Sequence, residues 1–440
     1  MHDPYSGYNA SRNAGNNSLL CQAPFNNMYF NVHGQAAPCW LTLDSSENIA
    51  EKTIKEIWTG ERFTRIRRAI RERKLSTYCS TCEKNIQTGN YVSVLAKLYD
   101  LNYPLTDFPV EMEFELSNIC NLECVMCKGE LSSSIREKRE HLPKLSSPYT
   151  QSFVEQLKDF LPYLKEAKFL GGEPFLIPLY YDIWDSIIKI NPEIKITVTT
   201  NGTVWNKRVI EILQALHCNI IISIDSFNSE TYKRIRIGGN LEKVLENFEQ
   251  FRSYCKSRNT YMGISINPLR KNWHELKSYV EFCNEKDVPL WFNTIVYPYT
   301  EALWTLSSSS LKKIHETLSQ QEPIVRPNNC SKGVYQTNTR NYDNFIEAQL
   351  KNWWEEAEKR EHLKAENAKT MNEEELFEKL KGNIRQRIFS DAYIPSNQLD
   401  QMASKIESKI NTLTYLSRSQ KVELFVMPET EAMLQIEATV

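Results

Sequence analysis

The sequence predicts an α/β protein whose core is a parallel β-sheet. Six apolar, β-branched runs follow one another between residues 110 and 300, and most segments between them carry apolar residues at helical spacing. Strands that alternate with helices indicate right-handed βαβ units in a parallel sheet. The run "NIIISI" is apolar throughout, as expected of a strand that is covered on both faces. At 440 residues the chain is long enough for two or three domains.

The carboxyl ends of these predicted strands carry the polar residues. The runs are "VEMEFELS", "EAKFLGG", "IKITVTTNG", "NIIISIDS", "YMGISIN" and "LWFNTIVYP". In barrel-like α/β folds the chemistry gathers where the strands end. We therefore expect the functional site at this edge of the sheet, together with the cysteine-rich segment "NICNLECVMC" that follows the first run.

Charge and hydropathy exclude several classes of partner. The chain has 53 Lys+Arg and 55 Asp+Glu, so its net charge indicates neither a nucleic-acid-binding nor an anionic membrane-binding protein. No apolar run reaches the length of a transmembrane helix, and the polar start "MHDPYSGYNASRNAGNNS" is not typical of a signal or transit sequence. We expect a soluble, cytoplasmic protein with no nucleic-acid or membrane partner.

Eleven cysteines in a reducing compartment favour metal binding over disulfides. One group has the spacing C-x3-C-x2-C and consists of Cys120, Cys124 and Cys127. A cubic iron–sulfur cluster normally takes four protein thiolates, so either a fourth cysteine comes from elsewhere or one iron is left for another ligand. Zinc held with a distant His or Cys is the alternative. We expect four scattered cysteines to be ordinary buried residues, namely Cys218, Cys255, Cys283 and Cys330.

The cysteine spacing, the "GGEP" segment and the order of the strands resemble the radical S-adenosylmethionine (SAM) superfamily over residues 110–300. The resemblance implies a partial (βα)6 TIM-like barrel in which Cys120, Cys124 and Cys127 hold a 4Fe-4S cluster. In that family the amino and carboxylate groups of SAM chelate the remaining iron. The resemblance therefore implies that the missing fourth ligand is the cosubstrate.

The same resemblance implies a set of SAM-binding residues. It comprises Met126, Gly171, Gly172, Glu173, Pro174, Thr200, Asn201, Ser223, Asp225 and Arg236. Glycine allows the backbone to approach a ligand closely, and Glu173 would accept a hydrogen bond from the methionine ammonium. Arg236 is placed like the arginine that pairs with the methionine carboxylate in relatives. Met126 departs from the commoner Tyr or Phe, and no catalytic acid or base is identified.

A second group of cysteines lies near the N-terminus and consists of Cys21, Cys39, Cys79 and Cys82. A predicted hairpin in "MYFNVHGQAAPCWL", a helix in "TIKEIWTGERFTRIRRAIRER" and a closing C-x2-C would bring these thiols together. This pattern resembles the twitch or SPASM extension of radical SAM enzymes and implies one auxiliary 4Fe-4S cluster, although in most relatives the extension follows the barrel. A zinc site is the alternative, because C-x2-C pairs are common zinc ligands.

We expect four segments along the chain. They are a flexible N-terminus over 1–18, a twitch/SPASM-like α+β domain over 19–100, the partial barrel over 108–325 and a mostly helical extension over 326–440. In the extension, Leu376 and Leu380 indicate a helix with one apolar face that packs against the barrel or within a small helical cap. We expect Trp353 and Trp354 to be apolar anchors.

The resemblance implies a radical SAM oxidoreductase that cleaves SAM reductively to a 5′-deoxyadenosyl radical, which then abstracts hydrogen from a substrate. An auxiliary cluster favours oxidation or epimerisation of a small alcohol, sugar or aminocyclitol, with a flavodoxin- or ferredoxin-like electron donor. Modification of a ribosomally made peptide is one alternative, and a non-catalytic metal-binding scaffold is another. The barrel itself does not name the substrate, because family members share the radical machinery.

Overall fold

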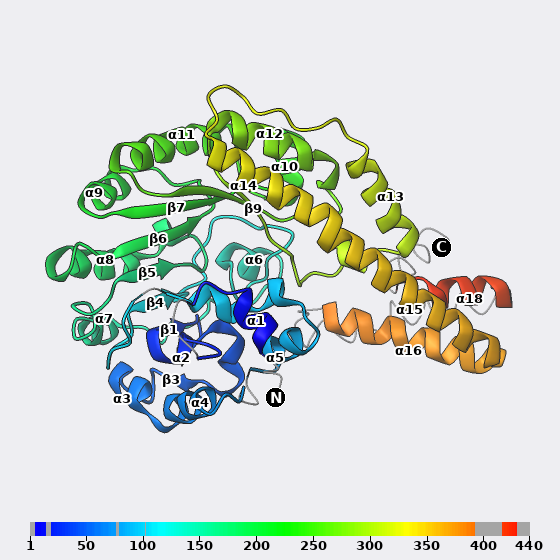
Figure 1. The fold of residues 1–440 in the computed structure, drawn as a ribbon, viewed down its shortest axis with the longest axis horizontal. Helices are drawn as coiled ribbons and strands as arrows, with labels where there is room; N and C mark the ends of the chain where they lie inside the picture. The colour runs from blue at the N-terminus through cyan, green and yellow to red at the C-terminus, as the bar shows by residue number, and fades with distance from the viewer. Residues whose placement is uncertain (1–4, 15–18, 76–78, 102, 392–415, 429–440) are drawn as a thin grey trace.

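The computed structural model describes residues 5–14, 19–75, 79–101, 103–391 and 416–428. Their core is one nine-stranded sheet with the order β3-β2-β1-β4-β5-β6-β7-β8-β9 (Figure 1). The sheet does not close on itself, so the architecture is a partial barrel, as expected. No helix of the described segments is long and apolar enough to cross a lipid bilayer.

Each of the six predicted runs contains one strand, and neighbouring strands are parallel. The strands are β4 (Glu111–Phe114), β5 (Glu166–Phe169), β6 (Lys195–Thr200), β7 (Cys218–Ser223), β8 (Met262–Ile266) and β9 (Leu290–Phe292). Helices run between them, namely α6 (Ser133–Lys138), α7 (Gln151–Leu157), α8 (Pro178–Ile190), α9 (Lys207–Ala215), α10 (Ser229–Ile235), α11 (Leu241–Arg258) and α12 (Leu276–Lys286).

The two faces of the barrel sheet differ in polarity. On β7, Cys218, Ile220 and Ile222 belong to the main hydrophobic core, whereas Asn219 and Ser223 point to the other face. The strand is therefore apolar on its outer face, whereas its inner face is mixed, with Ile221 between Asn219 and Ser223. Helices cover only the outer face of this sheet (Figure 1), and the inner face of the open barrel carries polar side chains.

The N-terminal hairpin is present and also joins the barrel. The expected antiparallel pair forms between β1 and β2, but β1 also pairs in parallel with β4, with Tyr29 opposite Glu113. The expected domains 19–100 and 108–325 therefore share one continuous sheet. The three added strands are β1 (Asn27–Phe30), β2 (Gln35–Ala37) and β3 (Glu47–Asn48).

The predicted N-terminal helix is divided in two at Gly60, whose extended backbone ends α3 and begins α4. Thr53 starts α3 with a reciprocal capping box to Glu56, and α4 buries an apolar face that includes Phe63 and Ile70. The helices of this part are α2 (Ala23–Asn26), α3 (Ile54–Thr59), α4 (Glu61–Arg71) and α5 (Ser80–Gln87).

Residues 5–14 correct the expectation of a flexible start. They contain the short helix α1 (Ser6–Ala10), in which Tyr8 is fully buried and donates a hydrogen bond to the Leu20 carbonyl at 3.0 Å. Arg12 forms a buried ion pair with Asp100. Polar composition gave no sign of these two long-range anchors. Residues 1–4 and 15–18 of the same expected segment lie outside the described residues.

The expected C-terminal extension is helical where it is described. Its described helices are α14 (Lys332–Asp343), a π-helical stretch (Asn344–Leu350), α15 (Lys351–Thr370), α16 (Glu373–Asp391) and α18 (Arg418–Val426), and α13 (Ser308–Ser319) precedes them within the expected barrel segment. Trp353 and Trp354 pack against the main core, as expected of apolar anchors. At the far end of α15, Leu376, Leu380 and Phe425 belong to a separate small core between α16 and α18 (Figure 1).

Tyr180 of α8 ties together the two strand ends that lead into the candidate site. Its side chain is fully buried, and its hydroxyl accepts the Leu116 N–H at 3.0 Å. The same hydroxyl lies 2.8 Å from the Phe114 carbonyl and 2.7 Å from the Leu170 carbonyl. One phenol therefore connects the ends of β4 and β5.

Replacing Tyr180 with Phe should lower the free energy of unfolding by about 1–3 kcal/mol, because the buried Leu116 N–H loses its partner. Chemical denaturation would measure the change. Tyr181→Phe is the matched control, since the Tyr181 hydroxyl donates a single bond to the Phe175 carbonyl from a partly exposed position. Equal losses in the two variants would contradict the role assigned to Tyr180.

Candidate functional site

The cysteine trio lies in the loop between β4 and α6 and forms one wall of a cavity. Cys120, Cys124 and Cys127 all line this cavity, which has a volume of about 230 Å³. The opposite wall consists of the residues at the carboxyl ends of β5, β6, β7 and β8. The chain therefore places the cysteines against the edge of the sheet where parallel α/β folds bind ligands.

Seven of the ten residues expected to bind SAM line this cavity. They are Met126, Gly171, Gly172, Thr200, Asn201, Ser223 and Arg236. The other three, Glu173, Pro174 and Asp225, are buried behind the lining. Six lining residues were not among the expected site residues, namely Leu122, Leu131, Ser132, Leu170, Thr199 and Asn267. For Leu170, Thr199 and Asn267, position at a strand end was the available signal.

The glycine pair is required by the protein's own packing. Gly171 and Gly172 have φ angles of 73° and 46°, which disfavour other residues. A Cβ atom on Gly172 would lie 2.2 Å from the Ile119 carbonyl oxygen, and one on Gly171 would lie 2.6 Å from Cγ of Glu115. The Glu173 N–H also donates to the Ile119 carbonyl at 2.7 Å. These contacts hold the cysteine loop against the end of β5.

Glu173 connects the ends of β5 and β6. Its fully buried carboxylate accepts hydrogen bonds from the Thr200 hydroxyl at 2.7 Å, the Asn201 N–H at 2.7 Å and the Phe175 N–H at 3.2 Å. Burial raises the pKa of Glu173 to about 7, although the three hydrogen bonds oppose the shift. The carboxylate therefore orders the cavity wall. Its contact with a methionine ammonium stays a prediction.

Arg236 lies between a buried carboxylate and a cysteine sulfur. Its Nε and Nη2 atoms are each 2.7 Å from Oδ2 of Asp225, and its Nη1 is 3.9 Å from Sγ of Cys124. The other Asp225 oxygen accepts the backbone and side-chain N–H groups of Asn267 at 2.8 and 3.1 Å. Burial lowers the pKa of Arg236, but the charges of Asp225 and Cys124 outweigh burial and raise it.

Burial also has the largest effect on the pKa of each thiol of the trio. It raises the pKa of Cys124 to about 11 and that of Cys127 to about 12, while Arg236 opposes both shifts. The Cys120 thiol pKa is raised by burial as well, and its sulfur lies 3.8 Å from Nδ2 of Asn201. Free thiols here stay protonated at neutral pH, so binding of a metal centre would displace their protons.

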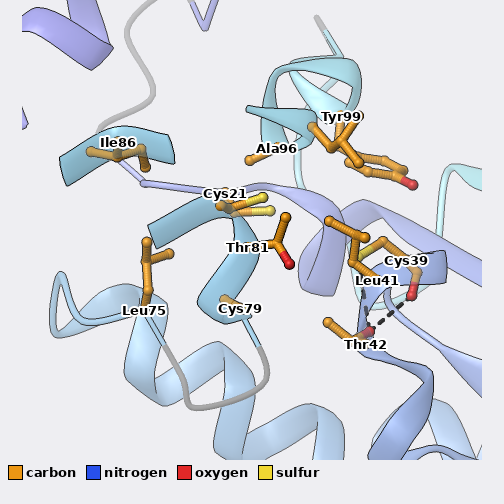
Figure 2. Close-up of a pocket in the computed structure, with 12 residues that line it drawn as sticks. Cys21, Cys39, Leu41, Thr42, Leu75, Cys79, Thr81, Ile86, Ala96 and Tyr99 are labelled. Atoms are coloured by element: carbon orange, nitrogen blue, oxygen red, sulfur yellow. Dashed lines mark hydrogen bonds between the residues drawn. The ribbon is translucent and has the colours of Figure 1, made fainter. Parts of the chain in front are cut away.

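The N-terminal cysteines line a second cavity (Figure 2). Cys21 precedes α2, Cys39 follows β2, and Cys79 and Cys82 lie at the start of α5. The four cysteines that the sequence grouped are therefore brought together. Apart from Thr42 and Thr81, the described residues that complete the lining are apolar or aromatic, namely Leu41, Leu75, Ile86, Leu95, Ala96 and Tyr99.

Both sets of cysteines were compared with the ligand geometry of a single metal ion. Among the described residues, no three His, Cys, Asp or Glu side chains lie close enough to hold one metal ion. A zinc ion requires its sulfur ligands at about 2.3 Å from a common centre. Both sets of cysteines line a cavity, and this arrangement fits a polynuclear cluster, in which each thiolate binds a different metal atom.

Two further polar residues lie beside the trio's cavity and were not predicted. Glu115 follows β4, and its Cγ lies against Gly171. The Tyr29 hydroxyl donates a hydrogen bond to the Glu115 carboxylate from the neighbouring strand β1. Burial raises the pKa of Glu115 despite this hydrogen bond. Sequence alone did not reveal the pair, because it depends on the parallel pairing of β1 with β4.

The buried Glu173 makes stability depend on pH. The folded-state pKa of about 7 lies above the unfolded value near 4.3, so the folded protein binds more protons between these values. The free energy of unfolding therefore falls as pH rises through this window, by on the order of 1 kcal/mol per pH unit. Glu173→Gln should flatten that slope in denaturation measured between pH 5 and 7.

Glu246→Gln on the exposed face of α11 is the control and should leave the slope unchanged. Glu111, whose pKa burial also raises to about 7, contributes equally to all three proteins. An unaltered slope in Glu173→Gln would show that Glu173 does not hold the proton.

Two protein-family models match the parts of the chain that contain the two sets of cysteines. Residues 114–283 match the model of the radical SAM superfamily, and residues 21–83 match the SPASM model, described as an iron–sulfur cluster-binding domain. The first range contains the cysteine trio and the strand ends, and the second contains all four N-terminal cysteines. Such a radical SAM domain takes a 4Fe-4S cluster and SAM, and a SPASM domain takes additional iron–sulfur clusters.

Similar proteins cover this chain in part. A GTP 3′,8-cyclase of Limosilactobacillus fermentum is 27% identical over 45% of this chain and 57% of its own length. That of Lactiplantibacillus plantarum is 25% identical over 55% of this chain and 71% of its own length. The chain spans about half the length of most of the curated relatives it matches.

Among solved structures, Streptococcus suis SuiB bound to S-adenosylmethionine is similar at 19% identity. The match covers 60% of this chain and 59% of SuiB with a TM-score of 0.36, a superposition too loose to carry an argument. The two family matches contain the cysteines that line the two cavities. The chain therefore contains a radical SAM domain over residues 114–283, preceded by an iron–sulfur cluster-binding domain over residues 21–83.

Proposed function

We propose that this protein is a radical SAM oxidoreductase that abstracts hydrogen from a small polar substrate held in the open barrel. The observation that carries the proposal is the trio's cavity, whose described lining contains three cysteines and faces four strand ends. A cubic cluster held by three thiolates keeps one iron free for another ligand. The polar groups of the opposite wall supply contacts for a ligand bound at that iron.

Each wall of the cavity has its own task. Cys120, Cys124 and Cys127 would hold a 4Fe-4S cluster, while Thr200, Asn201, Ser223 and Arg236 would orient SAM. When bound and reduced, this pair supplies a 5′-deoxyadenosyl radical. The protein's part is to bind, to orient and to exclude water. Met126, Leu122 and Leu131 give the cavity an apolar portion suited to an adenine ring.

The inner face of the barrel supports a hydroxylated or amino-bearing substrate. Lys168, Thr197, Asn219 and Ser265 lie on this face on four successive strands, β5 to β8. The Asn219 side chain donates to the Thr197 hydroxyl at 3.3 Å. Lys168, Thr197 and Asn219 are in register, whereas Ser265 is in register with Ser223 nearer the cavity. These donors and acceptors suit the hydroxyl groups of an alcohol, sugar or aminocyclitol, which we propose is oxidised or epimerised.

Glu115 is the group we assign to accept the substrate's proton. It stands where β4 ends, beside Gly171 of the cavity wall, and it receives the Tyr29 hydroxyl. Burial raises the pKa of Glu115 above that of an exposed carboxylate and so toward neutral pH. A general base works best when its pKa lies near the operating pH. Tyr29 would hold the carboxylate in place.

The N-terminal cysteines would hold an auxiliary cluster, whose chemistry is one-electron transfer. A flavodoxin- or ferredoxin-like protein in the cytoplasm would supply electrons. In support, none of the eleven cysteines, all of which lie in the described segments, forms a disulfide, as expected in a reducing compartment.

Counting iron tests the two centres. Anaerobically reconstituted protein should contain about eight irons per chain, falling to about four when Cys120, Cys124 and Cys127 are changed to Ala. A variant with Cys21, Cys39, Cys79 and Cys82 changed to Ala should also retain about four. Cys283→Ala, on the buried face of α12, should keep all of them. Four irons in the unaltered protein would contradict an auxiliary cluster.

Substrate-dependent release of 5′-deoxyadenosine tests the reaction. Alcohols, sugars, aminocyclitols and GTP would be supplied with SAM and a strong reductant, and deuterium from labelled substrate should appear in 5′-deoxyadenosine. Glu115→Gln should still transfer deuterium but should form at least tenfold less product, since a general base contributes about 100-fold or more. If no polyol increases 5′-deoxyadenosine above the substrate-free level, the proposed substrate class is wrong.

A further inference from the structure

The two cysteine-lined cavities differ in what surrounds the sulfur atoms. In the trio's cavity, two sulfurs face side-chain N–H groups, because Arg236 Nη1 lies 3.9 Å from Cys124 and Asn201 Nδ2 lies 3.8 Å from Cys120. The N-terminal cavity has no charged side chain among the described residues that line it. Backbone N–H groups bond three of its sulfurs, and the buried Arg12, paired with Asp100, acts on Cys21 from behind the lining. There, Thr42 Oγ1 lies 3.8 Å from Cys39 Sγ but donates its own hydrogen to the Cys39 carbonyl at 2.9 Å.

Arg236 is a fixed and buried cation. Its side chain is 7% exposed and Asp225 is fully buried, so the ion pair lies in a region of low dielectric. Asp225 takes two nitrogen atoms of the guanidinium and leaves Nη1 directed at Cys124. Two N–H groups of Asn267 satisfy the remaining Asp225 oxygen, which holds the carboxylate in position. The positive charge therefore lies nearer to the cysteine sulfur than the negative one.

These surroundings act on the reduction potential of a bound cluster. Reduction adds one negative charge, which is shared by the irons and the sulfur ligands. A nearby cation and N–H groups directed at the sulfurs stabilise that charge and raise the potential. Where no cation lines the cavity, enclosure by apolar side chains disfavours the added charge and lowers the potential.

We propose that Arg236, positioned by Asp225, raises the reduction potential of the centre at Cys120, Cys124 and Cys127 above that of the centre at the four N-terminal cysteines. A single electron from a chemical reductant such as Ti(III) citrate then resides on the trio's centre. An electron on a cluster at the N-terminal cysteines would transfer spontaneously to the centre of higher reduction potential. The N-terminal centre would be oxidised by one electron and the trio's centre reduced by one. The inference rests on the proposed function only in that both cavities hold clusters.

The order of the potentials does not by itself identify Arg236. A centre with three thiolates carries less negative charge than one with four, and that difference acts in the same direction. Variants of the Arg236–Asp225 pair separate the two causes, because they leave the number of thiolate ligands unchanged.

The test is a redox titration of the reconstituted, SAM-free protein, followed by electron paramagnetic resonance. The two multiple cysteine-to-alanine variants assign each signal to its centre. Arg236→Gln should move the midpoint potential of the trio's centre to a more negative value, and Asp225→Asn should move it to a more positive one. The double variant should fall between Arg236→Gln and the unaltered protein. The N-terminal centre should shift in none of them.

Arg234→Gln is the matched control, because it removes the same charge from an exposed position two residues earlier on α10. The proposal is overturned if Arg236→Gln leaves the potential of the trio's centre unchanged, if Arg234→Gln shifts it equally, or if the N-terminal centre has the higher potential. Should Arg236→Gln fail to assemble a cluster, a failure of Asp225→Asn to raise the potential also overturns it.

This design separates the inference from the proposed function. If the N-terminal cavity holds no cluster, the iron count reveals it, and the Arg236 shift is still measured in the variant that lacks those four cysteines. If no substrate is turned over, both midpoint potentials remain measurable, since the titration uses neither SAM nor substrate.

Discussion

The close approach of Gly172 to the Ile119 carbonyl is the constraint on which the site depends. A Cβ atom would lie 2.2 Å from that oxygen, so the cysteine loop reaches its position only because the residue is glycine. The Glu173 N–H then bonds the same carbonyl, and the Glu173 side chain crosses to Thr200 and Asn201. The first three barrel strands thereby hold the cysteine trio in one place.

The shared sheet has a comparable effect on the N-terminal cysteines. Because β1 pairs in parallel with β4, the domain that carries them is attached along the length of the first barrel strand and needs no flexible linker. The same pairing brings Tyr29 to Glu115 and Asn27 to Glu113, with the Asn27 amide donating at 2.9 Å. A polar network therefore lies between the two cysteine-lined cavities.

Sequence patterns located the elements better than the contacts between them. The six predicted runs each contain a strand, since β-branched periodicity is a local property of the chain. The polar inner face escaped prediction, because "NIIISI" does not reveal which side its helices cover. Glu173 and Asp225 were predicted beside the ligand, yet their carboxylates are occupied by Thr200, Asn201 and Arg236. Asn267 was missed because its role comes from its contact with Asp225.

The sequence by itself determined the strand positions, the two cysteine groups and the glycine pair. Each of these features is a pattern of residues that lie close together along the chain. Only the tertiary structure decided that both domains share one sheet, that Arg236 faces Cys124, and that the N-terminal cavity is apolar. These features join residues that are far apart in sequence. Their partners are selected by packing of the whole chain, which no local pattern encodes.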